Sequence, residues 1–197
     1  NFGSRIELLN CTFETSANLG HIDCHQGVVM EGCVFNGTAN FTEAHLKGYN
    51  YCRRTEFFHD TCFSKMLVSS DITFEKVTFG ANTDLAGATF QSVEFLQTIF
   101  EGVTNFQEAI FSGSLRCLES DFKKRVQFSH AIFLQKADFR NTRFSGVVSF
   151  ANLTSDYILL ARKQITKKIV AEREKAYATA EQEYLTLKHI FERQGLR

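Results

Sequence analysis

The chain has 197 residues, in which 22 lysines and arginines balance 22 aspartates and glutamates. A formal net charge of zero argues against a protein that binds nucleic acid or acidic substrates through a strong overall field. The composition also holds 21 phenylalanines but no tryptophan and no proline. Such a bias indicates one structural position that the same residue fills again and again, as in a repeat protein.

From residue 2 to residue 150, large apolar residues recur with alternating spacings of six and five, which gives a period of eleven. Two interleaved series run to Phe90, and the pattern then slips by one residue and resumes at Phe95. This lattice includes 19 of the 21 phenylalanines and leaves out only Phe58 and Phe191. The phenylalanines that we predict to form a buried core ladder are Phe13, Phe35, Phe57, Phe79, Phe90, Phe41, Phe63, Phe74, Phe95, Phe106, Phe128, Phe139, Phe150, Phe100, Phe111, Phe122, Phe133 and Phe144.

A second, smaller side chain accompanies each lattice position. The residue two before it is mostly Ala, Thr, Val, Ile or Cys. Since side chains alternate along a strand, each unit would point two side chains inward. Steps of five and six residues do not follow one face of a helix. A chain that turns a corner in every unit, with glycines such as Gly37 and Gly102 at corners, satisfies the pattern as stacked coils.

Units such as Ala-Thr-Phe-Gln-Ser, Thr-Asn-Phe-Gln-Glu-Ala-Ile-Phe and Ala-Asp-Phe-Arg-Asn-Thr-Arg-Phe resemble the pentapeptide-repeat family. The likeness is to the Phe-rich branch, in which five- and six-residue units alternate. It implies an all-β solenoid, a right-handed quadrilateral β-helix of about seven coils. The extra residue in alternate units predicts a bulge at one type of corner, and the slip near residues 90–95 predicts one distorted coil.

The chain divides into a repeat domain over residues 1–155 and a C-terminal helical segment over residues 156–197. The repeat begins at Phe2 without a cap, so we expect the chain to start within a repeat, as an excised domain or with that end covered by a partner. Residues 171–193 are rich in good helix formers. This helix could cap the last coil, form a homodimer or link to a further domain. Its apolar stripe is predicted to pack through Tyr177, Ala180, Tyr184, Leu187 and Phe191.

An aromatic cluster is the first candidate for a partner contact. Phe58 follows a lattice residue directly and should therefore face outward, and Tyr49 and Tyr51 lie near it in the sequence. Exposed aromatic residues on a solenoid face are typical of a contact patch. The alternative is a local rearrangement of the coil around Asn50.

A short basic run is the second candidate. It falls at a predicted corner, where it would be either a solvated surface or a contact for an anion or a protein partner. Its residues are Lys123, Lys124 and Arg125.

The sequence predicts no catalytic residue, no metal site and no cofactor. His21, Asp23, Cys24 and His25 are the nearest approach to a metal-binding set, but Cys24 lies on the lattice and should point inward, away from the outward-facing Asp23 and His25. The six cysteines show no C-x-x-C pair. No nucleophile with a neighbouring base and no phosphate-binding loop can be recognised, so we expect that the protein is not an enzyme.

Three functions follow from this sequence. The first is a structural scaffold that binds a protein partner rather than nucleic acid. The resemblance implies a second, a DNA mimic that binds type II topoisomerases as in quinolone resistance, although residues 1–155 carry only about −3. It also implies a third, the soluble domain of a larger protein linked to a membrane channel. The chain itself shows no membrane span and no signal peptide, so we expect a cytoplasmic location.

Overall fold

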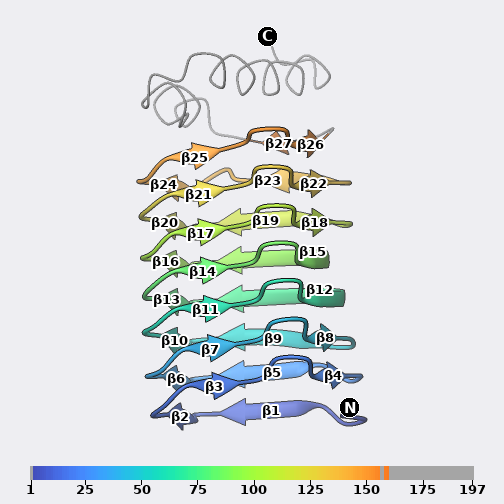
Figure 1. Cartoon of the computed structure of the whole chain (residues 1–197), viewed down its shortest axis with the longest axis vertical. Coiled ribbons are helices and arrows are strands. Elements are labelled where there is room, and N and C mark those ends of the chain that lie inside the picture. Colours follow the sequence, from blue (N-terminus) through green and yellow to red (C-terminus); the bar gives the residue numbers. More distant parts are fainter. Residues whose placement is uncertain (1, 156–157, 160–197) are drawn as a thin grey trace.

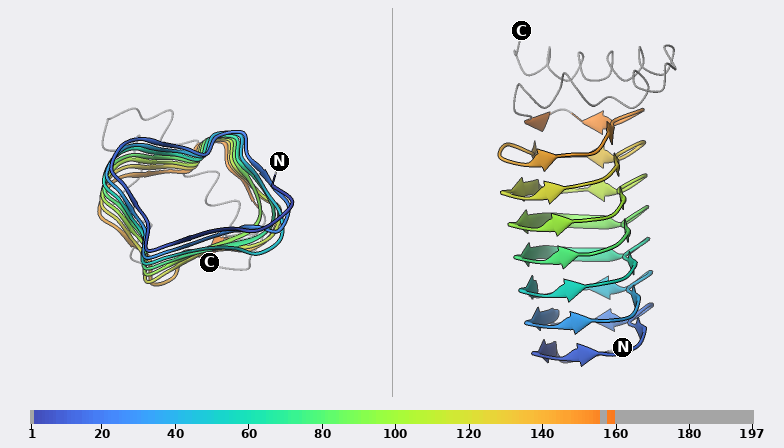
Figure 2. Two further views of the ribbon diagram at one scale, coloured as in Figure 1. Left: turned by 90° about the horizontal axis from the view of Figure 1, so that it is seen from below. Right: turned by 90° about the vertical axis from the view of Figure 1, so that its left-hand side faces the viewer.

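The computed structural model describes residues 2–155 and 158–159. They form a right-handed parallel β-solenoid of about seven coils, with short strands stacked level upon level (Figure 1). Seen along the axis, the coils superimpose as a four-sided outline (Figure 2). The predicted solenoid is therefore confirmed. The predicted C-terminal helix, with Tyr177, Ala180, Tyr184, Leu187 and Phe191, lies outside the described residues.

One wall of the rod is a seven-stranded parallel sheet, here called the phenylalanine sheet because its seven lattice positions are all Phe. Partners on successive coils are 22 residues apart, as for Phe35 and Phe57, except across the slip, where Phe79 pairs with Phe100 after 21 residues. Its strands are β2 (Thr12–Phe13), β6 (Val34–Phe35), β10 (Glu56–Phe57), β13 (Thr78–Phe79), β16 (Ile99–Phe100), β20 (Asp121–Phe122) and β24 (Arg143–Phe144). Adjacent rings along this ladder stack with centroids 4.4–5.2 Å apart.

The next wall is a second seven-stranded parallel sheet, here called the asparagine sheet. An Asn or Asp precedes several of its lattice residues and accepts a hydrogen bond from the backbone N–H two positions on, as Asn40 does from Thr42 and Asn105 from Gln107. This local bond closes the turn that follows the strand. Its strands are β3 (Ala17–Asn18), β7 (Ala39–Asn40), β11 (Thr61–Cys62), β14 (Thr83–Asp84), β17 (Thr104–Asn105), β21 (Val126–Gln127) and β25 (Val148–Ser149).

The remaining two walls join into one sheet of thirteen strands, here called the large sheet. They merge because β12 (Leu67–Glu75) and β15 (Thr89–Leu96) run through the corner without a break. One wall adds β4 (Asp23–Cys24), β8 (His45–Leu46), β18 (Ile110–Phe111), β22 (Ile132–Phe133) and β26 (Thr154–Ser155). The other adds β1 (Ile6–Leu9), β5 (Val28–Glu31), β9 (Asn50–Arg53), β19 (Leu115–Leu118), β23 (Ala137–Asp138) and β27 (Ile158–Leu159). Since β27 pairs with β23, strand pairing continues past residue 155.

The predicted slip is visible where β12 meets β15. Val68 pairs with Phe90, but Asp71 pairs with Ser92, so Ser69 and Ser70 together stand opposite the single residue Gln91. The coil that contains Gln91 is one residue shorter than the coil before it. The distortion predicted near residues 90–95 therefore occurs as a local register shift, and the stacking resumes beyond it.

The extra residue of each six-residue unit also has a fixed place. Two positions after every second lattice residue, the backbone turns into the left-handed region, with φ between 48° and 64°. Only two of these positions hold glycine, although this conformation costs other residues about 1–2 kcal/mol each. The positions are Asn10, His21, Gly32, Glu43, Arg54, Lys65, Lys76, Gly87, Gln97, Glu108, Glu119, His130, Asn141 and Asn152.

The interior is a continuous apolar core. All of the phenylalanines predicted for the ladder are buried except Phe13, which is half-buried on the first described levels. The cysteines within the core are free thiols, and burial raises the pKa of Cys52 to about 12. Beside Cys52, which replaces the larger side chains found at Met30 and Phe74, a cavity of about 10 Å³ remains.

Candidate interaction surface

The structure separates the three aromatic residues that lie close together in the sequence. Tyr51 lies in β9 of the large sheet and Tyr49 directly precedes this strand, whereas Phe58 follows β10 of the phenylalanine sheet. The left-handed corner at Arg54 lies between them. The two tyrosine rings stack with centroids 6.1 Å apart. No ring contact within residues 2–155 joins Phe58 to either, so the expected three-residue cluster does not form.

The exposed Arg5 and Tyr49 and the half-buried Tyr51 form a surface group, here called the tyrosine patch. The Tyr49 side chain is 56% exposed, and the guanidinium carbon of Arg5 lies 5.6 Å from the centroid of its ring. Gly27 occupies the level between Arg5 and Tyr49, with φ at 97°. A Cβ at Gly27 would lie 1.9 Å from the Tyr49 carbonyl oxygen. The close stacking of these coils therefore requires glycine at this level.

Asn50 anchors the backbone between the two tyrosines. Its side chain is buried at a position where the other coils place an apolar residue, such as Val28 or Ile72, and this is the departure from the repeat. Its Oδ1 accepts a hydrogen bond of 3.0 Å from the Val28 N–H, and its Nδ2 donates one of 2.9 Å to Ser70 Oγ. One side chain thus ties three successive coils together and fixes the direction of Tyr49 and Tyr51.

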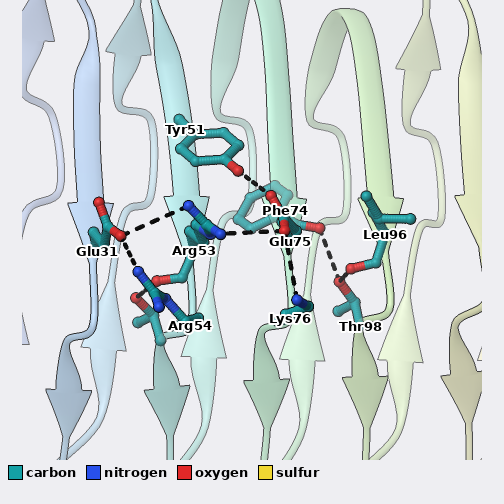
Figure 3. A network of polar contacts seen from close by, with 10 residues as sticks. Glu31, Tyr51, Arg53, Arg54, Phe74, Glu75, Lys76, Leu96 and Thr98 are labelled. Atoms are coloured by element: carbon teal, nitrogen blue, oxygen red, sulfur yellow. Dashed lines mark hydrogen bonds and ion pairs between the residues drawn. The ribbon is translucent and has the colours of Figure 1, made fainter.

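A polar network supports Tyr51 from the outside (Figure 3). The Tyr51 hydroxyl donates to the Glu75 carboxylate, whose Oε1 lies 3.6 Å from Arg53 Nε. Arg53 also approaches Glu31, with 3.9 Å between Nη1 and Oε1, and Arg54 bonds the same carboxylate. Partly exposed pairs of this kind contribute about 0–1 kcal/mol each. Their main effect is to hold the Tyr51 ring in one orientation.

The same contacts shift the ionisation of this pair. Partial burial and the bond to Glu75 raise the pKa of Tyr51 to about 12. The hydrogen bond from Tyr51, together with the nearby Arg53 charge, lowers the pKa of Glu75. At neutral pH the tyrosine is therefore a neutral donor and the glutamate a charged acceptor, which is the combination that a stable hydrogen bond needs.

The basic run lies at the corner between β20 and β21, and its three side chains are exposed. Lys123 Nζ lies 2.8 Å from Glu101 Oε1 on the previous coil, and this bond raises the pKa of Lys123. Lys124 and Arg125 complete the corner. The basic run follows β20 and Phe58 follows β10, so both lie at the same edge of the phenylalanine sheet. The sequence had not indicated that the two candidates share a surface.

The histidine-rich segment is divided as its sequence predicts. The thiol of Cys24 points inward and donates to the Gly27 carbonyl at 3.0 Å, while His25 Nε2 lies 3.2 Å from Asp23 Oδ2 on the outer surface. In the part of the chain that the structure describes, no group of three or more His, Cys, Asp or Glu side chains is arranged to hold a metal.

Sequence reasoning missed one arrangement on that surface. Ser69 Oγ lies 3.0 Å from His45 Nε2, and His45 Nδ1 lies 3.7 Å from Asp23 Oδ1. These residues come from three successive coils, so only the stacking brings them together. The His45–Asp23 distance exceeds a hydrogen bond, and Asp23 therefore does not fix the imidazole as a Ser-His-Asp triad requires.

Comparisons with known proteins extend only to the fold. No family model and no curated protein matches the sequence. Full-length QnrB1, a plasmid-mediated fluoroquinolone resistance protein, is similar in structure, with a TM-score of 0.50 and 16% identity over 78% of this chain and 76% of that one. A trypsin-treated variant of QnrB1 gives a TM-score of 0.47 and 14% identity, over 78% of each chain. Over the described ranges no helix is long and apolar enough to cross a membrane. At this level of identity, what the chain shares with QnrB1 is the right-handed solenoid fold.

Proposed function

We propose that this protein is a non-catalytic scaffold of the pentapeptide-repeat type, which binds a protein partner through the tyrosine patch. The exposed Tyr49 ring, stacked on Tyr51 and covered by Arg5, is the observation that carries the proposal. Tyrosine and arginine are among the residues that are enriched at the positions where interfaces gain most of their binding energy. Because Asn50 and Glu75 already fix this group, little side-chain entropy remains to be lost on binding.

The division between inside and outside supports a role without catalysis. Inward positions of the described coils hold large apolar side chains together with small residues, among them buried threonines such as Thr55 and Thr98, and the outward side chains stand on short strands joined by tight corners. Catalytic groups usually converge from loops into a cleft. Among the residues that the structure describes, Ser69 with His45 and Asp23 comes nearest to a catalytic triad, and the distance from His45 to Asp23 is too long to position the base.

A quantitative capture experiment tests the scaffold proposal. Full-length protein and two variants, Tyr49→Ser and Leu134→Ser, serve as baits in an extract of the source cells. Leu134 is 63% exposed on the large sheet and lies four coils away from Tyr49, so its variant is a matched surface control. We expect a partner that is retained by the wild type and by Leu134→Ser but lost at least tenfold with Tyr49→Ser. Equal retention by all three baits would contradict the proposal.

Topoisomerase binding is a second candidate, and the structural likeness to QnrB1 favours it. The surface charge argues the other way, because the row across the large sheet alternates Glu31, Arg53 and Glu75 instead of forming an acidic stripe. DNA gyrase supercoiling, inhibited by a fluoroquinolone, would decide. Recovery of supercoiling as this protein is added would support the candidate, and unchanged inhibition at a large excess would exclude it.

A further inference from the structure

Two of the six cysteines occupy the same position on successive coils. Cys11 and Cys33 each stand two residues before a lattice phenylalanine of the phenylalanine sheet. The register around them is fixed on both sides, since β1 pairs with β5 before the two residues and β2 pairs with β6 after them. No other two cysteines of the chain are related in this way. The corner between the large sheet and the phenylalanine sheet thus carries two thiols on neighbouring levels.

The sulfur of Cys33 is directed toward the coil that carries Cys11. It lies 3.2 Å from the carbonyl oxygen of Leu8 on that coil, and 3.6 Å from the carbonyl oxygen of Glu31 on its own coil. Stacked strands are about 4.8 Å apart, and a disulfide joins residues whose Cα atoms are about 4.4–6.8 Å apart. A rotation of the Cys11 side chain and a small closure of the corner would bring the two sulfurs together, because bridged Cβ atoms lie about 3.8 Å apart.

The two thiols differ in their access to solvent. Cys33 is fully buried, and burial raises the pKa of its thiol. Cys11 is half-buried, and its sulfur lies 3.5 Å from the Leu9 carbonyl oxygen on the exposed side of the corner. A small oxidant therefore reaches Cys11 first. Cys33 is then the neighbouring thiol that can react with the oxidised sulfur, as a resolving cysteine does.

We propose that Cys11 and Cys33 are an oxidative modification site, at which hydrogen peroxide converts the two thiols into a reversible disulfide between the first two coils. The Cys11 thiolate attacks one peroxide oxygen, the O–O bond breaks, and a sulfenic acid forms as hydroxide leaves. The Cys33 sulfur then attacks the Cys11 sulfur, and the hydroxyl group leaves with the Cys33 proton as water. Together, two thiols and one peroxide give one disulfide and two waters, so sulfur is oxidised and peroxide oxygen is reduced.

The bond would hold the first coil, which carries Arg5, against the second. Two amides report on the junction between these coils. The Ile6 N–H donates to the Gly27 carbonyl at 3.0 Å, and the Asn10 N–H donates across the same junction at 2.8 Å. Both hydrogen bonds break whenever the two coils separate locally. A covalent link at the adjacent corner opposes that separation, so both amides should exchange more slowly in the oxidised protein.

Mass spectrometry of the full chain, treated with hydrogen peroxide and then blocked with N-ethylmaleimide, tests the site. We expect the wild type to yield a peptide pair that joins Cys11 to Cys33, and dithiothreitol to restore both thiols. In Cys33→Ser, dimedone should label Cys11 at least tenfold more than in the wild type, because the sulfenic acid is no longer resolved. In Cys11→Ser, oxidation of Cys33 should be at least tenfold slower. Serine fits this position, since Ser120 occupies it on a later coil, and circular dichroism verifies folding.

The matched control is Cys62→Ser, which changes a half-buried cysteine of the asparagine sheet and should leave the bond between Cys11 and Cys33 unchanged. Amide exchange at Ile6 should slow at least threefold on oxidation of the wild type but not of Cys33→Ser. Equal dimedone labelling of Cys11 in the wild type and in Cys33→Ser would overturn the proposal. So would a disulfide from Cys11 to Cys62 or between two chains. None of these outcomes bears on partner binding at Tyr49.

Discussion

Phe57 and Phe58 are neighbours in the sequence with opposite roles, and this makes them the sharpest pair to perturb. Phe57 is 1% exposed, and its ring stacks on Phe35 at 4.6 Å and on Phe79 at 5.1 Å between centroids. Phe58 points out of the same sheet and is 52% exposed. Replacing each by alanine removes the same atoms from the core in one case and from the surface in the other.

The expected cost of Phe57→Ala follows from its surroundings. Removing a core phenylalanine costs about 3–5 kcal/mol, and the cost is larger where neighbours cannot close the cavity. Stacked rings contribute about 0.5–1.5 kcal/mol beyond their buried area, and Phe57 has one on each side. Since the levels above and below are fixed by backbone pairing, we expect a loss of about 4–5 kcal/mol. Phe58→Ala should stay within about 0.5–1 kcal/mol of the wild type.

Urea unfolding followed by circular dichroism measures both variants. The dependence of the unfolding free energy on urea must be compared as well, because coils of a solenoid can unfold separately and a smaller slope would reveal that. A loss below about 2 kcal/mol for Phe57→Ala, or equal losses for the two variants, would refute the assignment of inward and outward positions.

Three further predictions concern the corners, the thiols and the acidic groups. Gly146→Ala should lower the free energy of unfolding in urea by about 2–3 kcal/mol, because a Cβ at this position would lie 1.9 Å from the Lys124 carbonyl oxygen. The control is Gly3→Ala, because no atom lies within 4 Å of a Cβ at Gly3. Cys52 should not react with a disulfide reagent at pH 8 until the protein unfolds, since its buried thiol has a pKa of about 12, whereas the half-buried Cys11 and Cys62 should react first. Early labelling of Cys52 would contradict the core assignment. Arg140 donates a hydrogen bond to the Asp138 carboxylate and thereby lowers the pKa of Asp138 in the folded protein. The ionised carboxylate should therefore stabilise the fold above the ordinary pKa of 3.8, and this stabilisation should be lost as the pH falls through the lowered pKa of the folded state. Asp138→Asn should therefore narrow the difference in unfolding free energy between pH 7 and pH 3, and an unchanged difference would argue against the role of this pair.

The solenoid could be predicted because the same pattern of inward side chains recurs in every coil. Each coil must place a large side chain at the same inward points, so the period of eleven appears in the sequence itself. The slip was equally visible, since deleting one residue shifts every later lattice position. The sequence placed the slip within residues 90–95, and the structure places it at Gln91, which alone stands opposite Ser69 and Ser70.

Residue type alone identifies only some of the left-handed corners, such as Gly32, Asn10 and Asn141. Positions such as Glu43, Arg54 and Lys65 adopt positive φ although none is a residue that favours it. Their conformation is imposed by the stacked strands on each side, which fix where the chain must turn. Only the spacing of the six-residue units pointed to these sites.

The sequence could not predict which outward side chains contact one another across coils. Arg5 meets Tyr49 across 44 residues, and Tyr51 meets Glu75 across 24. Such pairs depend on the length of a coil and on which wall each residue occupies. The sequence showed that Tyr49 and Tyr51 are unusual, but it grouped them with Phe58, which the corner at Arg54 carries to a different wall.

Site-specific photocrosslinking tests most directly whether the rod acts by binding a protein at the tyrosine patch. A benzophenone amino acid placed at Tyr49 is irradiated in source cells, and the same group at Leu134 serves as the control for a solvent-exposed site. Our account predicts one discrete adduct with a different protein at position 49, reduced when Arg5 is replaced by alanine, and no such adduct at position 134. The absence of an adduct at position 49, or the same adducts at both positions, would contradict it.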